Sequence, residues 1–290
     1  MVVYIKLLLT ALFWGGTFIA GKLIANRVEP FSAAFLRFCV ASILLLILTS
    51  RERGGFPPIK KTQFITLFLL GMTGVFSYNA LFFKGLQFIG AGRASLIIAN
   101  NPVIITLFAA LIFKEKLSWI KVSGIVLSVT GAMVVISKGS PGELLRGGVG
   151  WGEILIFGCV GSWVAYTLIG KAIMKDLSPL ASVSYSSLIG TAALFIPALA
   201  EGMTTAVPQY SILDWVCIAY LGVFGTVLGF VWYYEGIKAL GPTRAGQFIN
   251  FVPICAILLA FFILGEPVTL SLLVGAGLVI SGVSLTNMRV

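Results

Sequence analysis

Residues 14–22 read WGGTFIAGK and residues 163–171 read WVAYTLIGK, so a Trp and a Gly-Lys pair recur at the same spacing 149 positions apart. Pro30 and Pro179 keep this offset. Because Gly and Pro set the course of a backbone, matches at these residues indicate an internal duplication rather than shared composition. Further along the chain the offset becomes 151, and it aligns Gly71 with Gly222, Gly74 with Gly225, Gly85 with Gly236, Arg93 with Arg244, Pro102 with Pro253, Glu115 with Glu266, Gly124 with Gly275 and Gly131 with Gly282.

The composition is that of an integral membrane protein. Of the 290 residues, 59% are hydrophobic and 10% are charged, whereas soluble domains are about 25% charged. The first apolar stretch has a copy in mid-chain, where cleavage makes no sense, so we interpret it as a span and not as a signal peptide. The sequence predicts an all-α fold of ten transmembrane helices, most of them near the roughly 20 residues that cross a bilayer, at 4–24, 31–50, 63–83, 93–113, 119–137, 151–171, 180–200, 213–235, 243–264 and 270–287.

The duplication divides the chain into two domains. Residues 1–137 form the first five-helix repeat and residues 151–290 the second, and the polar, Gly-rich residues 138–150 form a linking loop. An odd number of spans in each repeat inverts the second repeat in the membrane relative to the first. Inverted repeats are typical of transporters that bind their substrate at the repeat interface. We therefore expect the two repeats to surround a central cavity.

The net charge of +10 indicates orientation rather than nucleic-acid binding, because cytoplasmic loops of membrane proteins are rich in Lys and Arg. With a cytoplasmic N-terminus, thirteen cations lie inside and seven outside, and Arg37 is counted among the seven. The stretch from Arg51 to Lys61 contributes four of the inner cations. We expect both termini in the cytoplasm, and a prokaryotic inner (plasma) membrane as the location.

The sequence offers no metal or cofactor site. It contains no His, and its four Cys residues all fall inside expected spans without a pair at ligand spacing. A free Cys in such a position behaves as a small hydrophobic residue. We expect no disulfide, no cofactor and no covalent chemistry, and hence no enzyme.

Several motifs resemble those of EamA-type carriers of the drug/metabolite transporter superfamily, over nearly the whole chain. They are Trp14-Gly15-Gly16, Asn101-Pro102, Val252-Pro253, the helix end KEKLS at 114–118 and the helix end GEPVT at 265–269. The resemblance implies a central cavity built from spans 1, 3, 4, 6, 8 and 9, with spans 5 and 10 at the periphery. It also implies export of amino acids or related metabolites, while more distant relatives move sugars, nucleotide sugars or sugar phosphates.

Two helix-breaking prolines, Pro102 and Pro253, fall near the middle of spans 4 and 9. A Pro inside a helix removes the hydrogen bond to the carbonyl four residues earlier. In a bilayer such a carbonyl must line a cavity or find a new donor. The neighbouring amides Asn100, Asn101, Gln247 and Asn250 then predict a binding site for a zwitterionic or polyhydroxylated solute, and the alternative is that they bridge helices.

Aromatic residues form the second group of candidates. Trp14 and Trp163 are repeat equivalents near mid-span, whereas Trp in membrane proteins usually lies at the interfaces. As a cavity lining, aromatic rings would contact an apolar side chain or attract an ammonium group. The alternatives are packing and exposure to lipid. The other residues in this group are Tyr78, Phe82, Tyr166 and Tyr233, with Asn79 beside Tyr78.

Charged side chains are expected only near span ends. All ten acids fall in loops or within about two turns of a span end, which disfavours proton coupling through a buried carboxylate. We place the Lys and Arg residues near helix ends as well, so a phosphate-binding cation is missing and phosphorylated substrates rank low. Glu115 and Glu266 are interpreted as structural caps or ion-pair partners.

These features predict a membrane transporter that exports small neutral or zwitterionic metabolites, with amino acids first, by alternating access and facilitated diffusion. A carrier of sugars, purines or other neutral metabolites is the alternative within transport. A non-transporting membrane enzyme or structural subunit is the alternative from another class. The expected partners are a small-molecule substrate and the lipid bilayer but no nucleic acid, and a monomer is compatible with the sequence.

Overall fold

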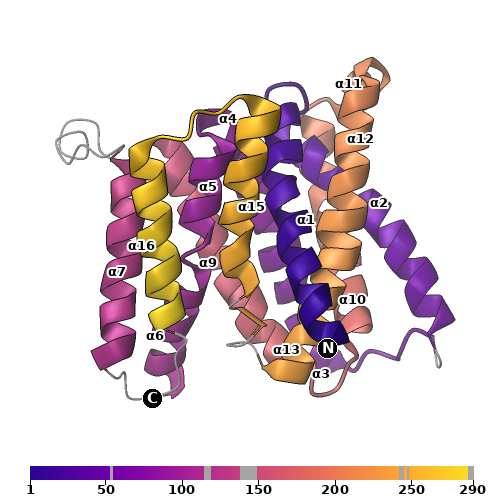
Figure 1. The fold of residues 1–290 in the computed structure, drawn as a ribbon. Helices are drawn as coiled ribbons and strands as arrows, with labels where there is room; N and C mark the ends of the chain where they lie inside the picture. The colour runs from indigo at the N-terminus through magenta and orange to yellow at the C-terminus, as the bar shows by residue number, and fades with distance from the viewer. Residues whose placement is uncertain (53–54, 114–118, 138–148, 242–244, 247, 287–290) are drawn as a thin grey trace.

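The computed structural model describes residues 1–52, 55–113, 119–137, 149–241, 245–246 and 248–286, and every regular element in these ranges is helical (Figure 1). The first half contains α1 (Val2–Ile24), α2 (Pro30–Arg51), α3 (Lys61–Leu70), η1 (Gly71–Ser77), α4 (Tyr78–Phe88), α5 (Ala91–Ile98), α6 (Asn101–Phe113) and α7 (Trp119–Ile136). The second half contains α9 (Trp151–Ile173), α10 (Pro179–Ala200), α11 (Met203–Ala206), η2 (Val207–Gln209), α12 (Ile212–Tyr220), η3 (Leu221–Leu228), α13 (Gly229–Leu240), η4 (Phe248–Asn250), α15 (Phe251–Leu259), η5 (Ala260–Leu264) and α16 (Leu270–Thr286).

Six of the described helical runs are long and apolar enough to cross a bilayer. They are Val2–Ile24, Pro30–Arg51, Gln63–Phe88, Trp151–Ile173, Pro179–Ala200 and Ile212–Leu240. Three shorter apolar runs are Trp119–Val135, Phe248–Leu264 and Leu270–Leu285. At 1.5 Å per residue, the six longer runs span the roughly 30 Å hydrocarbon core. The start of α1 and the end of α16 lie at the same end of the bundle, the lower end in Figure 1.

Two of the long runs contain a π-helical segment in their middle. The segment η1 joins α3 to α4, and η3 joins α12 to α13. The offset of 151 superimposes them, since Gly71 matches Gly222 and Gly74 matches Gly225. π-Helical turns are rare and frequently occur at functional sites.

The helical runs around the two prolines are interrupted. Helix α5 ends at Ile98, and α6 begins at Asn101 with Pro102 as its second residue. Pro253 is the third residue of α15, directly after the short 3₁₀ turn η4. A Pro in the first turn of a helix is tolerated because the N–H groups there have no partner within the helix.

Glycines allow the helices of the two halves to approach one another closely at corresponding positions. A Cβ on Gly85 of α4 would lie 2.7 Å from Ile156 of α9, and one on Gly236 of α13 would lie 2.6 Å from Leu7 of α1. Leu7 and Ile156 are 149 positions apart. Thus α4 packs on α9 in the same way as α13 packs on α1.

Helices α7 and α16 form a tightly packed pair at one side of the bundle (Figure 1). A Cβ on Gly131 would lie 2.8 Å from the Gly275 carbonyl oxygen, and one on Gly282 would lie 2.6 Å from that of Gly124. Small residues permit such close approach of membrane helices. The four glycines are the two pairs that the offset of 151 matches, and they lie seven residues apart on their helices.

Polar contacts tie the helices together at the end opposite the start of α1. The Glu266 carboxylate accepts hydrogen bonds from the backbone N–H groups of Ala91 (2.9 Å) and Gly92 (3.2 Å), so it caps α5 as expected. The Lys22 amine donates hydrogen bonds to the carbonyls of Leu86 (2.7 Å) and Ile89 (2.9 Å). Its side chain therefore does not extend to the membrane–water interface. Glu115 lies outside the described residues.

Candidate functional site

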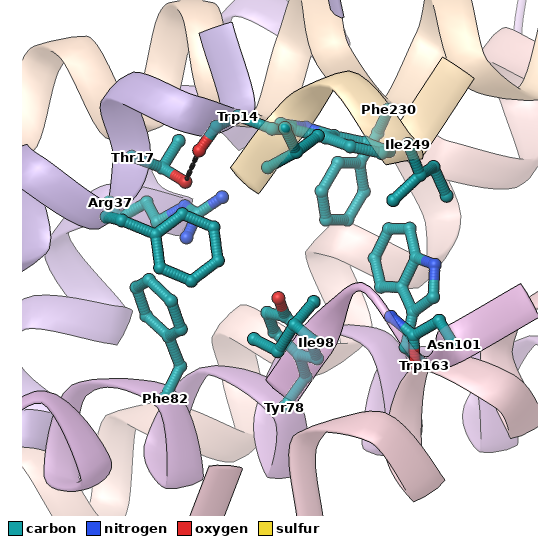
Figure 2. Close-up of a pocket in the computed structure, with 12 residues that line it drawn as sticks. Trp14, Thr17, Arg37, Tyr78, Phe82, Ile98, Asn101, Trp163, Phe230 and Ile249 are labelled. Atoms are coloured by element: carbon teal, nitrogen blue, oxygen red, sulfur yellow. Dashed lines mark hydrogen bonds between the residues drawn. The ribbon is translucent and has the colours of Figure 1, made fainter. Parts of the chain in front are cut away.

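A central cavity lies between helices of both halves (Figure 2). The empty space among its side chains, counted with its opening to the outside, is about 450 Å³ and is narrow. Most of the lining is aromatic or aliphatic, and few polar groups face it, which is typical of small-molecule sites. The lining residues are Trp14, Thr17, Phe18, Arg37, Tyr78, Phe82, Ile98, Asn101, Trp163, Phe230, Ile249 and Val252.

The repeat-equivalent tryptophans meet in this cavity. The rings of Trp14 and Trp163 pack edge to face with 5.3 Å between their centroids. Trp163 also contacts Phe230 at 5.3 Å and Tyr78 at 5.4 Å. The indole N–H of Trp14 donates to the Gly225 carbonyl of η3 (3.0 Å), so a carbonyl of the π-helix fixes this ring. Such rings offer faces to an apolar group or to a cation.

Arg37 contradicts the expectation that cations lie only near span ends and on the outer side. It lies on α2, its side chain lines the cavity, and the residue is only 3% exposed. Nε donates to the Thr226 hydroxyl (2.9 Å), and Nη1 donates to the Asn79 side-chain oxygen (2.8 Å). Charge in a membrane span faces the protein interior because lipid cannot solvate it. This rule, applied to a single Arg within an otherwise uncharged apolar stretch, would have found Arg37.

Both residues that hold Arg37 are themselves bonded to π-helical carbonyls. The Asn79 amide donates to the carbonyls of Val75 (2.8 Å) and Gly74 (3.3 Å) in η1. The Thr226 hydroxyl donates to the Leu221 carbonyl in η3 (3.0 Å). The two equivalent π-helices therefore position one guanidinium. We expected Asn79 to contact the substrate. In the structure it holds the Arg37 side chain and is not among the residues that line the cavity.

The two adjacent asparagines of the first break differ in their surroundings. The Asn100 amide donates to the carbonyls of Leu96 (3.0 Å) and Ile97 (3.3 Å) at the end of α5, and its oxygen accepts from the Ser128 hydroxyl of α7 (2.7 Å). Asn101 lines the cavity, and its buried side-chain oxygen has no hydrogen-bond partner within the described part of the chain. Asn100 thus bridges helices, whereas Asn101 is free to receive a donor.

The other expected site residues divide into two groups. Tyr78 and Phe82 line the cavity with stacked rings 5.9 Å apart. Tyr166 packs behind Trp163 at 5.3 Å, and Tyr233 packs beside Trp14 at 5.2 Å and lines a smaller adjoining pocket. Asn250 is buried outside the cavity lining, and Gln247 lies outside the described residues.

Among the described residues, no carboxylate lines the cavity. The acids within helices lie near helix ends. Glu235 of α13 pairs with Lys6 of α1 at 2.6 Å, and Glu153 in the first turn of α9 pairs with Arg93 at 2.9 Å. Among the described lining residues the site thus combines a guanidinium, an amide and aromatic rings, and its ionisable groups are Arg37 and Tyr78.

Comparisons with known proteins agree with this architecture. The chain is 32% identical to the uncharacterized transporter YyaM of Bacillus subtilis, over 97% of this chain and 92% of that protein. It is 28% identical to the probable terminal-alkyne amino-acid exporter of Streptantibioticus cattleyicolor, over 98% of this chain and 92% of that protein. A solved crystal structure with 18% identity covers 99% of this chain and 97% of its own, with a TM-score of 0.67.

The sequence model of the EamA-like transporter family matches residues 1–137 and again residues 150–288. The two matched segments fall on the two halves that the internal duplication defines. Together with the helical membrane architecture and the similarity to YyaM, this double match covers nearly the whole chain. The chain therefore belongs to the EamA-like transporter family.

Proposed function

We propose that this chain is a ten-helix carrier that moves small neutral or zwitterionic metabolites, first of all amino acids, by alternating access. The observation that carries the proposal is the central cavity in which Trp14 and Trp163 meet from equivalent helices. In transporters built from inverted repeats, the substrate lies at the repeat interface. The interface here offers ring faces, one amide and one guanidinium.

The paired contacts of the two halves support the inverted repeat. Besides the glycine contacts of α4 and α13, Gly74 of η1 packs on Tyr166, and Gly225 of η3 packs on Thr17, which is 149 positions earlier. Two repeats of five spans, inverted relative to each other, bring α1 and α16 back to the same side. We place that side in the cytoplasm and the protein in the inner membrane, because the cation count favours it.

The choice of amino acids is supported by one relative and by the chemistry of the cavity. The relative from Streptantibioticus cattleyicolor is a probable exporter of an amino acid. A zwitterion with an apolar side chain matches a site that has polar groups at its edge and aromatic rings between them. Sugars and purines remain the alternative, since they too would stack on the rings.

We propose facilitated diffusion as the mode of transport. A proton-coupled carrier needs a group that titrates near neutral pH in the cavity, usually Asp, Glu or His. The sequence has no His, and no carboxylate lines the described cavity. The solute would then move along its own gradient.

Counterflow in proteoliposomes tests this function. Liposomes with the purified chain are loaded in turn with unlabelled L-leucine, glucose or adenine, and uptake of the same labelled solute is followed. We expect transient accumulation of L-leucine above that in protein-free liposomes. Accumulation of glucose or adenine alone would favour the alternative, and no counterflow by any solute in a wider panel would contradict transport of neutral metabolites.

A further inference from the structure

Arg37 and the two residues that hold it, Asn79 and Thr226, form a polar group without a counterpart in the other half of the chain. Under the two sequence offsets, Arg37 corresponds to Ser186, Asn79 to Phe230, and Thr226 to Val75. The Ser186 hydroxyl donates to the Val183 carbonyl of its own helix (3.1 Å). The guanidinium and both groups that hold it are therefore departures from the internal symmetry of the fold. Packing of the repeats alone does not require them, because the other half packs without them.

The guanidinium has capacity left for a ligand. Within the described part of the chain, its Nε and Nη1 donate hydrogen bonds to two uncharged acceptors, and no carboxylate forms an ion pair with it. The third nitrogen, Nη2, takes part in neither of these hydrogen bonds. A charge buried inside a membrane protein is costly unless it meets an opposite charge. The matching partner for a planar guanidinium is a carboxylate, which it binds through two parallel hydrogen bonds.

We propose that Arg37 binds the carboxylate of the transported solute, so that a free carboxylate is the feature this carrier requires. The inference rests on the proposed function and narrows it to small carboxylates with an apolar side chain, such as neutral amino acids. Sugars and purines lack the group that Arg37 would receive. Asn79 and Thr226 are positioning residues that fix the guanidinium on both sides.

The opposite side of the cavity suits the rest of an amino acid. Figure 2 shows Arg37 and Asn101 on opposite sides of the cavity. The rings of Phe230 and Trp163 lie on the same side as Asn101. The unpartnered oxygen of Asn101 accepts hydrogen bonds, and an α-ammonium group donates them. A doubly charged phosphate would fit less well, because Arg37 is the one cation among the described lining residues.

The test compares ligands that differ in one group at a time. The wild-type chain in detergent is heated with L-leucine, L-leucinamide, isoamylamine or 4-methylpentanoate, and Tm is measured. We expect L-leucine and 4-methylpentanoate to raise Tm, while the amide and the amine leave it unchanged. Equal stabilisation by L-leucine and L-leucinamide, or stabilisation by none of the four, would overturn the inference. Because these measurements use the wild type, they do not depend on whether an Arg37 variant folds.

Variants of Arg37 identify the residue that reads the carboxylate. Arg37→Gln is expected to weaken L-leucine binding at least about tenfold, because charge-assisted hydrogen bonds are the stronger ones. Arg37→Lys keeps the positive charge but loses the planar guanidinium that forms two parallel hydrogen bonds. The affinity of this variant for L-leucine should therefore lie between those of the wild type and Arg37→Gln. Arg51→Gln removes an exposed Arg from the same helix and serves as the control with wild-type binding. Unchanged L-leucine binding in a folded Arg37→Gln would overturn the inference.

The two proposals fail in different ways. If L-leucine binds in an Arg37-dependent manner but shows no counterflow, transport of this solute is contradicted while carboxylate recognition stands. If Arg37→Gln transports glucose or adenine as well as the wild type does, and no carboxylate binds, the chain is a carrier but Arg37 does not select carboxylates. Stabilisation by a phosphate monoester with none by 4-methylpentanoate would likewise contradict the assignment to carboxylates.

Discussion

At the scale of single residues, what surrounds a polar group decides whether it holds the fold or binds a solute. Asn100 and Asn101 are neighbours in sequence, yet the former makes three hydrogen bonds to the protein and the latter keeps a buried oxygen without a partner. The sequence predicted polar side chains beside Pro102 but gave no means to separate the two. The difference depends on which of them faces α7, a tertiary contact.

Replacing these asparagines one at a time should separate the two roles. Asn101→Ala is expected to raise the apparent KM for L-leucine at least about tenfold with nearly unchanged Tm, because a hydrogen bond to a charged group such as the α-ammonium contributes about 1.5–3 kcal/mol. Asn100→Ala removes the side-chain partners of the Ser128 hydroxyl and the Leu96 carbonyl and should lower stability by about 1–3 kcal/mol. Thermal unfolding and counterflow of both variants check this. The opposite pattern would place the cavity on the other side of the helix break.

At the scale of elements, glycines and π-helices set how the helices meet. The packing of α7 on α16 was predictable, because glycines seven apart on one face indicate close approach. The π-helical segments were not predictable, since the matched glycines at 71, 74, 222 and 225 fit an α-helix equally well. The inward position of Arg37 was also missed, because the residue was assigned to the outer side by sequence distance from the end of its span.

Two glycines of α16 give a prediction for packing. In Gly282→Ala the new Cβ would lie 2.6 Å from the Gly124 carbonyl oxygen of α7, so the helices must separate and Tm should fall. Overpacking of this kind typically costs about 1–3 kcal/mol. Gly277→Ala is the matched control, because nothing lies within 4 Å of its Cβ and the helix propensity of Ala is higher. Since α7 and α16 contribute no lining residue to the described cavity, KM for L-leucine should be unchanged in both variants. Equal Tm values for Gly282→Ala and Gly277→Ala would contradict the close packing of α7 on α16.

At the scale of the whole molecule, the family and the paired contacts of the two halves could be predicted from sequence matches, while the asymmetry of the cavity could not. Repeat-equivalent contacts such as Gly85 with Ile156 and Gly236 with Leu7 follow from the duplication. Arg37, Asn79 and Thr226 stand at positions where the two halves differ in sequence. An alignment that looks for matching residues does not detect such positions.

Energy coupling is a property of the whole carrier. With no titrating carboxylate or His in the described cavity lining, a pH gradient imposed on sealed proteoliposomes at zero membrane potential should not concentrate L-leucine. The measurement is the steady ratio of inner to outer L-leucine, with a protonophore as the control. Uphill accumulation that the protonophore abolishes would contradict facilitated diffusion and would direct attention to Glu235 and its partner Lys6.

Alternating access is tested most directly by two distances that the repeat makes equivalent. Val2 at the start of α1 and Lys175 just beyond α9 lie at one end, whereas Asn26 just beyond α1 and Trp151 at the start of α9 lie at the other. The offset of 149 relates Val2 to Trp151 and Asn26 to Lys175, and all four residues are exposed.

Spin labels on each pair, in a Cys-free background in liposomes, report the two separations by double electron–electron resonance. A ligand shifts the population toward the state that it binds better. With saturating L-leucine, one distance should therefore increase while the other decreases. Two distances that change in the same direction, or that both stay constant while L-leucine counterflow proceeds, would contradict alternating access between the two repeats.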